Sequence, residues 1–275
     1  MISKAQEIYE NDIVVDSYTD NKGLIANIRS FAIFDYLKAK LQRSDDDDGY
    51  VITEDVLSAT QFGAPQKRMR FVVMGIRKDI ANEVKLPEGK YKDGPYRTVA
   101  DAIQDLEDVE PVYNVSDDKN GIKLQAKTDL SDLAQTLRDS KILYNHIITK
   151  TTPTAMERFK ALEQGQNFHS LSEEMKTNTY TDVTRTQNTI YLRLKYDEPS
   201  GTVVNVRKSM WVHPTKDRAV SIREAARLQT FPDSFVFLGT KDKQYQQVGN
   251  AVPPIMAKAI AEKLAYQLNK ALSKD

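Results

Sequence analysis

The stretch that decides the fold is residues 218–254, RAVSIREAARLQTFPDSFVFLGTKDKQYQQVGNAVPP. Its first part predicts a helix over residues 222–229, which must stop before Phe231-Pro232 because a residue that precedes proline disfavours helical backbone. Its last part places two prolines at the start of a final helix, where proline is well tolerated. The apolar stripe of that final helix is Met256, Ile260, Leu264 and Leu268.

The preceding sequence shows the helix and strand signals of an α/β protein. Apolar residues at three- and four-residue spacings predict a helix over residues 25–43. A short helix is expected over residues 98–106, with Thr98 as its N-cap. Residues 50–59 and 71–79 are rich in β-type residues and predict two strands, the second of them buried.

The middle of the chain is less regular. Residues 142–180 have a mixed, loop-rich composition, and alternation over residues 188–206 predicts a hairpin around residues 198–201. A segment rich in proline and glycine, LPEGKYKDGP at residues 86–95, is the best candidate for a domain boundary.

Composition excludes several classes of protein. The chain has 275 residues, 40% of them hydrophobic, and no apolar run approaches the roughly 20 residues of a membrane helix, so no membrane association is expected. The N-terminal sequence is too polar for a secretory signal, so a cytoplasmic protein is expected. The absence of cysteine excludes disulfides, thiolate catalysis and cysteine-based zinc sites. Four aspartates at residues 45–48 predict an exposed loop, and no metal site is expected.

The charge is unevenly distributed although the formal net charge is zero. Residues 176–230 carry ten positive and five negative side chains, a balance of +5, whereas residues 101–140 lean acidic. Two interpretations stay open: a DNA-facing half with a solvated back, or ordinary surface variation.

A second motif, FGAPQKRMR at residues 62–70, precedes the strand expected from residue 71. Arg68 and Arg70 lie two residues apart, so both can project from the same side of an extended segment. Guanidinium groups in such a position can hold a phosphate or a flipped base through planar, charge-assisted hydrogen bonds.

Together these motifs resemble three blocks of the DNA cytosine-5 methyltransferases: G-x-P-Q-x-R-x-R, R-E-x-x-R-L-Q-x-F-P-D and G-N-A-V-P-P. The resemblance implies the C-terminal part of a Rossmann-like methyltransferase sheet, together with a mixed, loop-rich target-recognition domain. It divides the chain into a partial catalytic α/β domain at residues 1–90, the recognition domain at 91–217, and a return to the catalytic domain with the C-terminal helix at 218–275. The reaction it implies is methyl transfer from S-adenosylmethionine to cytosine in a specific site of double-stranded DNA, as in bacterial restriction-modification systems.

The resemblance also implies roles for individual residues. Arg68 and Arg70 would face the DNA backbone and the target cytosine as supporting catalytic residues, with Gln66 organising their loop. Arg223 and Arg227 would anchor the recognition region through buried ion pairs. Candidate DNA contacts are Arg193, Thr202, Val203, Asn205, Arg207 and Lys208. Asn250, Ala251 and Val252 would line the cofactor pocket, at a glycine turn that starts a helix. Trp211 is expected in the core.

The family's nucleophile is a cysteine in a Pro-Cys loop, and this sequence has no cysteine. The glycine-rich cofactor loop and the Glu-Asn-Val block are also not recognisable. One interpretation is the recognition subunit of a split enzyme, inactive without an N-terminal subunit that carries these blocks. The cofactor pocket would then be incomplete in this chain. The alternatives are a non-catalytic DNA-binding or regulatory protein, and an inactive remnant or piece of a longer protein.

Overall fold

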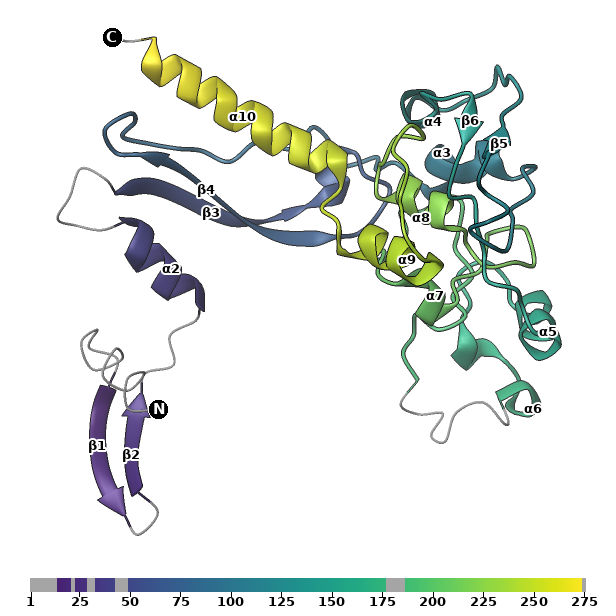
Figure 1. Cartoon of the computed structure of the whole chain (residues 1–275), viewed down its shortest axis with the longest axis horizontal. Coiled ribbons are helices and arrows are strands. Elements are labelled where there is room, and N and C mark those ends of the chain that lie inside the picture. The colour runs from purple at the N-terminus through teal and green to yellow at the C-terminus, as the bar shows by residue number, and fades with distance from the viewer. Residues whose placement is uncertain (1–13, 21–22, 29–32, 43–48, 177–185, 274–275) are drawn as a thin grey trace. The chain divides into compact units, whose positions relative to one another are not determined.

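The computed structural model describes residues 14–20, 23–28, 33–42, 49–176 and 186–273, and Figure 1 shows their helices and strands. These residues form two compact units. The first unit takes its described residues from the ranges 1–54, 73–85 and 264–275, and the second takes them from 55–72 and 86–263.

The first unit contains the antiparallel pair β1 (Val14–Asp20) and β2 (Gly23–Ile28), followed by α2 (Ile33–Gln42). The helix predicted over residues 25–43 is therefore wrong in its first part. Ile25 pairs with Tyr18 across the β1–β2 sheet, and helical structure is seen only from residue 33. The four aspartates at residues 45–48 lie outside the described residues.

Strands β3 (Tyr50–Ser58) and β4 (Met69–Arg77) pair with each other and confirm the two predicted strands. Only one face of β4 is well covered. Val72 packs with Met256 of the final helix, α10 (Pro254–Leu272), whereas the side chain of Met69 is 55% exposed. The expectation of a fully buried strand was therefore too strong, because an apolar run does not tell how many of its faces are covered.

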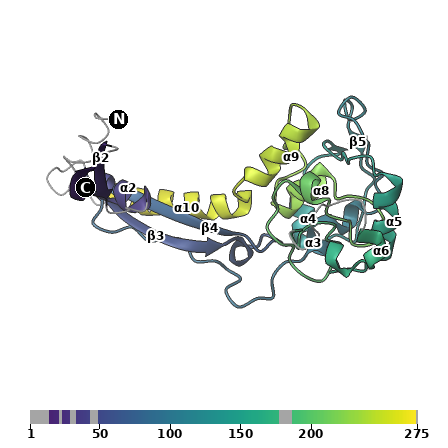
Figure 2. The same cartoon turned by 90° about the horizontal axis from the view of Figure 1, so that it is seen from below.

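The second unit consists of short helices joined by long loops, as Figure 2 shows. Its α-helices are α3 (Val99–Ile103), α4 (Asp132–Leu137), α5 (Pro153–Ala161), α6 (Glu173–Lys176), α7 (Val206–Ser209), α8 (Ile222–Leu228), α9 (Lys241–Asn250) and the first part of α10. Three single 3-10 turns occur at Ala59–Phe62, Gln104–Leu106 and Phe168–Ser170, and the two-residue strands β5 (Ile122–Lys123) and β6 (Ile142–Leu143) pair antiparallel.

Helix α8 lies at the centre of the main core of this unit, and all seven of its residues are buried. It begins with a capping box in which the Ser221 hydroxyl accepts from the Glu224 amide and the Glu224 carboxylate accepts from the Ser221 amide. Thr98 caps α3 in the same way with Asp101, as predicted. Trp211, expected in the core, is 1% exposed among the same apolar residues.

The hairpin predicted over residues 188–206 is wrong. The amides of Arg193 and Leu194 donate to the carbonyls of Gln166 and Val212, so the segment pairs with distant parts of the chain instead of with itself. The alternation arose because Tyr191 and Leu194 are buried in two different apolar clusters.

The fold is mixed α/β, as expected, and every sheet found among the described residues has two strands. The chain enters the long segment of the second unit at Leu86, where the segment rich in proline and glycine begins. The described residues of the expected recognition region at 91–217 and those at 218–263 belong to that same unit. Among helices of the described residues, none is long and apolar enough to cross a membrane.

Candidate functional site

A buried polar network joins the motif at residues 62–70 to both C-terminal motifs. The amide of Gln66 donates to the carbonyl of Leu228 (3.0 Å) and to the side-chain oxygen of Gln229 (2.8 Å). Its own oxygen accepts from the Val203 amide (3.1 Å). Gln66 is fully buried, so this set of partners satisfies an amide that would otherwise be costly to bury.

Arg68 extends this network to helix α9. Its guanidinium donates to the carbonyl of Val203 (2.7 Å) and to that of Gly249 (2.9 Å), and Gln229 donates to the neighbouring carbonyl of Val248 (2.8 Å). Two buried side chains thus tie α9 to the loop at residues 200–205. We call Gln66, Arg68 and Gln229, with the backbone groups they bind, the polar hub.

Gly249 is the point of closest backbone approach in the polar hub. A Cβ atom at this position would lie 2.7 Å from the carbonyl carbon of Val204 and 3.0 Å from the amide nitrogen of Asn205. Any side chain would therefore push the loop away from α9. The expectation of a glycine turn at the start of a helix is wrong in position, because Gly249 and Asn250 form the last turn of α9.

The arginines of α8 point into the protein. Arg227 forms buried ion pairs with Asp233 (2.6 Å) and Asp105 (2.5 Å), and Arg138 pairs with the same Asp105 (2.7 Å). These pairs join α8 to the segment after α3 and to the Phe-Pro-Asp turn.

Arg223 instead binds mostly backbone. It donates to the carbonyls of Tyr144 (2.8 Å), Pro232 (2.9 Å) and Phe235 (2.7 Å). Burial lowers the pKa of Arg223 to about 10, so the group remains charged at neutral pH. Both arginines hold loops in place and have no surface for a ligand.

Glu224 is the acidic partner on the same helix. Burial alone would raise the pKa of Glu224, but two hydrogen bonds and the charge of Arg218 outweigh burial and lower it. His213 lies with its Nε2 atom 3.7 Å from the Glu224 carboxylate, and burial lowers the pKa of His213 to about 4. The histidine is therefore neutral at physiological pH.

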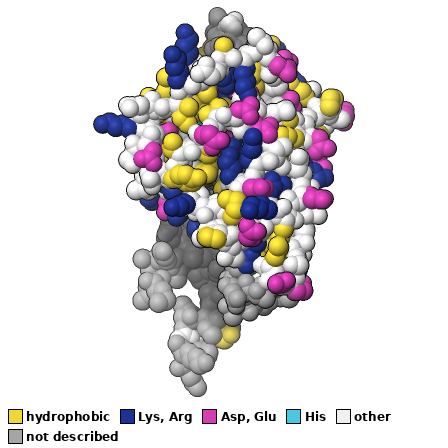
Figure 3. Space-filling model, turned by 90° about the vertical axis from the view of Figure 1, so that its right-hand side faces the viewer, with side chains coloured by type: hydrophobic (Ala, Val, Ile, Leu, Met, Phe, Trp, Pro, Cys, Tyr) yellow, Lys and Arg dark blue, Asp and Glu magenta, His cyan; other side chains and the backbone are white. Residues whose placement is uncertain are grey.

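These contacts change the interpretation of the local positive charge. Arg193 is buried, donates to the carbonyls of Phe159 (2.6 Å) and His213 (3.0 Å), and pairs with Asp217 (2.6 Å). Together with Arg218, Arg223 and Arg227, it turns inward, so much of the excess charge forms no basic surface. On the face of the second unit shown in Figure 3, positive and negative side chains are interspersed.

The two arginines of the Q-K-R-M-R motif have different environments. Arg68 is 1% exposed and both terminal nitrogens of its guanidinium donate within the polar hub, whereas Arg70 is half-buried and donates to the Met69 carbonyl (3.0 Å). The expectation that both face a ligand is therefore not met by Arg68, and Arg70 alone is partly open to solvent.

The remaining candidate DNA contacts lie in or beside the loop at residues 200–205. The Thr202 hydroxyl donates to the Lys67 carbonyl (2.8 Å), and Val203 is fully buried, with its backbone bound by the polar hub. Arg193 and Val203 thus have no side-chain surface for a duplex here.

Asn205, Arg207 and Lys208 line one hollow of about 660 Å³, together with residues of α9. Arg207 forms an ion pair with Asp242 on that helix. This hollow, which we call the loop–helix hollow, is lined by Val204, Asn205, Arg207, Lys208, Asp242, Lys243, Gln246, Gly249 and Asn250.

The three candidate cofactor residues come immediately after Gly249 in the sequence. Asn250 is exposed and belongs to the loop–helix hollow, Ala251 is half-buried, and Val252 is 43% exposed. An amide beside an exposed apolar side chain suits one wall of a site for S-adenosylmethionine, and the described residues do not enclose these groups.

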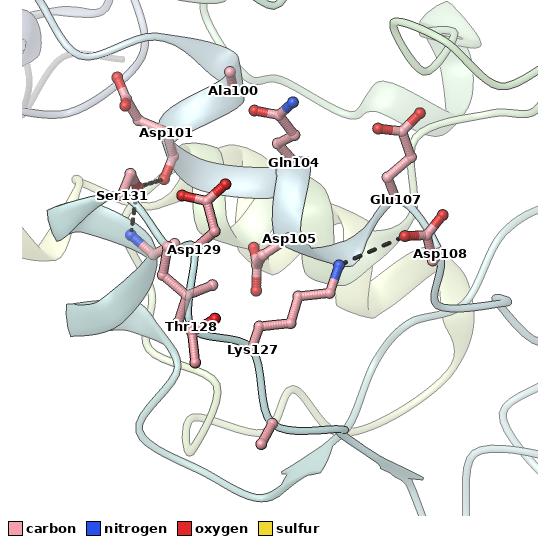
Figure 4. A pocket seen from close by; sticks show the side chains of 13 residues that line it. Ala100, Asp101, Gln104, Asp105, Glu107, Asp108, Lys127, Thr128, Asp129 and Ser131 are labelled. Atoms are coloured by element: carbon pink, nitrogen blue, oxygen red, sulfur yellow. Dashed lines mark hydrogen bonds and ion pairs between the residues drawn. The ribbon is translucent and has the colours of Figure 1, made fainter.

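A second hollow, of about 620 Å³, lies between α3 and the segment before α4 (Figure 4). Its lining contains a single lysine, Lys127, which pairs with Asp108 at 3.6 Å, and the acidic residues Asp101, Asp105, Glu107, Asp108 and Asp129. Its acidic character does not favour a polyanion.

Sequence reasoning missed several residues of the site. Gln229 and Asp233 were visible in their motif, but their partners were not, because Gln66 and Gln229 are 163 residues apart. Asp105 gave no signal at all, since its role depends on Arg227 and Arg138. Lys243 was also missed, because only folding brings α9 beside residues 204–208.

Comparison with known proteins identifies the class. The family model of C-5 cytosine-specific DNA methylases matches residues 29–266, and the chain belongs to this family. Its relatives are named type II methyltransferases, consistent with restriction-modification, and methyltransferases of this family use S-adenosylmethionine.

Individual relatives sharpen this assignment. The type II methyltransferase M1.HphI of Haemophilus parahaemolyticus is 34% identical over 214 residues, which cover 78% of this chain and 48% of the relative. M.AquIB of Picosynechococcus sp. is 36% identical over 135 residues, which cover 45% of this chain and 88% of the relative. A putative DNA modification methyltransferase encoded within an E. coli prophage has a TM-score of 0.58 and 25% identity, over 80% of this chain and 61% of its own. The chain spans only about half to three-fifths of the length of the first curated relatives it matches.

Proposed function

We propose that this chain supplies the DNA-recognition part of a type II DNA cytosine-5 methyltransferase, and that it acts with a polypeptide segment that carries the catalytic cysteine. The observation that carries the proposal is the polar hub. It uses residues from all three family motifs to hold the recognition loop against α9, while the sequence contains no cysteine to attack cytosine.

Each part of the site has a task in this proposal. Arg70, partly open to solvent, is the arginine that contacts the DNA backbone or the target base. Arg68 and Gln66 act as positioning residues, since the two terminal nitrogens of Arg68 donate to Val203 and Gly249 and the Gln66 amide binds Gln229. Arg223 and Arg227 fix the loops on either side of α8.

The proposal also assigns part of the cofactor site to this chain. Asn250, Ala251 and Val252 would form one wall of the S-adenosylmethionine site, with Asn250 donating or accepting a hydrogen bond and Val252 packing against the ligand. The bound cofactor supplies the methyl group. The remaining walls would come from the cysteine-bearing segment, which is either a separate subunit or another part of the same polypeptide.

Two comparisons support an incomplete enzyme. The chain corresponds to 58% and 48% of the length of two relatives, so residues equivalent to a large part of those proteins are not in this sequence. The match to M.AquIB, at 135 residues, fills 88% of that relative, which is therefore shorter than this chain. M.AquIB is thus named a type II methyltransferase although it is shorter than this chain.

Reconstitution tests this function. Purified chain is mixed with the polypeptide encoded next to it that contains a Pro-Cys loop, and transfer of the labelled methyl group to duplex DNA is measured. We expect methylation only with both components, and none when the cysteine of the partner is replaced by serine. The absence of any Pro-Cys coding sequence contiguous with or adjacent to this one would contradict the proposal.

A further inference from the structure

The loop–helix hollow has a composition that the recognised motifs do not explain. It brings Arg207 and Lys208 of α7 beside Lys243 of α9, and Asp242 is the one acidic side chain in its lining. Arg207 pairs with that aspartate, so Lys208 and Lys243 provide an uncompensated charge of +2. Both lysines are exposed, and the described residues give neither of them an ion pair.

Lys243 lies at the end of its helix where a positive charge is electrostatically disfavoured. It lies in the first turn of α9, next to Lys241 and Asp242. The positive end of the helix dipole disfavours a cation there by about 0.3–1 kcal/mol. Burial and the charge of Arg207 lower the pKa of Lys241, which indicates that positive charge is concentrated at this end of α9. An anion in the hollow would relieve this repulsion.

Asn205 supplies an independent indication of a ligand. Its side-chain oxygen is buried and has no hydrogen-bond partner among the described residues, although the residue lines the hollow. A half-turn of the amide would bring its NH₂ group to the same place without breaking a hydrogen bond made by the described chain. A buried amide oxygen that lacks a partner is costly unless a ligand satisfies it.

We propose that the loop–helix hollow binds a backbone phosphate of the DNA, with Lys208 and Lys243 as its cations and the Asn205 amide as a hydrogen-bond donor. This inference rests on the proposed function, and it assigns Lys243 to DNA binding. The polar hub then has a structural consequence. Arg68 and Gly249 hold α9 against residues 203–205, and the two lysines, one from α7 and one from α9, line the same hollow.

The salt dependence of DNA binding by the full chain tests the proposal. Fluorescence anisotropy gives the affinity for a labelled duplex at several salt concentrations, for the wild type and for Lys208→Gln, Lys243→Gln and the double variant. Each lost phosphate contact is expected to reduce the slope of log K against log salt by about 0.9, equally for different duplex sequences. If both lysines hold one phosphate, the double variant loses about 0.9 in slope, and each single variant loses less because the remaining lysine still neutralises that phosphate. The matched control is Lys258→Gln on α10, outside the hollow, whose exposed lysine pairs with Glu262.

A cofactor carboxylate has chemistry similar to a phosphate, so S-adenosylmethionine binding is measured by calorimetry on the same variants combined with the cysteine-bearing polypeptide, which supplies the other walls of the cofactor site. A reduced salt slope with unchanged cofactor affinity supports the proposal. An unchanged salt slope in the double variant overturns it, whether or not cofactor affinity falls. Failure of the wild type to bind any duplex would count against the proposed function itself, and this outcome differs from a wild type that binds with a slope unaffected by the variants.

Discussion

The substitution Gly249→Ala separates two opposite expectations. Gly249 lies in the last turn of α9, and alanine in a helix is favoured over glycine by up to about 1 kcal/mol, so local propensity predicts stabilisation. The structure predicts the reverse. The added Cβ would lie 2.7 Å from the Val204 carbonyl carbon and 2.8 Å from its oxygen, whereas ordinary contacts are about 3.5–4.0 Å.

The size of the expected loss of stability follows from these short contacts of the added Cβ atom. The loop must move by roughly 1 Å, which stretches the Arg68 hydrogen bond to Val203 from its present 2.7 Å. Overpacking of this kind costs about 1–3 kcal/mol, and a weakened buried hydrogen bond adds about 1 kcal/mol. After subtracting the propensity gain, we expect a net destabilisation of about 1–3 kcal/mol.

Urea unfolding measures this directly, because the single tryptophan, Trp211, is buried in the core of the second unit and reports its unfolding by fluorescence. The matched control is Gly201→Ala, where the nearest atom to a new Cβ is Trp211 Cζ2, at 3.9 Å. The control is expected to change stability by less than about 1 kcal/mol. A Gly249→Ala variant as stable as the wild type, or more stable, would refute the close packing of the loop on α9.

Two further predictions concern buried charge. Arg68→Ala removes two buried hydrogen bonds and leaves the Val203 and Gly249 carbonyls unpaired, so a loss of about 3 kcal/mol is expected; Arg70→Ala, two residues along, should change stability by less than about 0.5 kcal/mol in the same urea assay. The low pKa of His213, about 4 against an ordinary 6.5, means that the unfolded chain binds a proton between these values while the folded chain does not. Stability should therefore fall as pH drops from 6.5 to 4, by up to about 3 kcal/mol, and His213→Asn should reduce that loss. The lowered pKa of Glu224 should add a separate loss below its ordinary 4.5 that the variant retains; equal pH profiles for variant and wild type would contradict the assignment to His213.

Local signals in the sequence were sufficient for several elements. Thr98 caps α3 as its sequence position predicts, and Phe231-Pro232 limits α8 as expected. Strands β3 and β4 and the helix after Pro253 were predicted for the same reason, since their residue types and periodicity act within a few positions.

Elements that depend on distant partners could not be predicted. Ile25 fits a helical stripe, but pairing with Tyr18 places it in a strand. Residues 188–206 alternate like a hairpin, yet Arg193 and Leu194 pair with Gln166 and Val212. Tertiary contacts outweigh the weak propensities of such short segments.

The residues of the candidate site also fall into those that the sequence indicates and those that only the folded structure brings together. The motifs directed attention to Gln66, Arg68 and Gly249, which the structure brings together in the polar hub, but residue type alone cannot tell an arginine that faces a ligand from one that binds carbonyls inside the protein. Arg68 and Arg193 could be ligand contacts by sequence, and only their burial shows the internal role. Conversely, Lys243 has no motif, and its position beside Lys208 exists only in the folded chain.

The most direct test of the account is transfer of the labelled methyl group from S-adenosylmethionine to duplex DNA by this chain alone, with a cysteine-bearing partner, and with the partner's cysteine changed to serine. The account predicts methylated cytosine only in the second mixture. Methylation by the chain alone would contradict it, since this sequence has no thiol to supply. So would the absence of methylation when the chain and an intact partner form a stable complex on DNA.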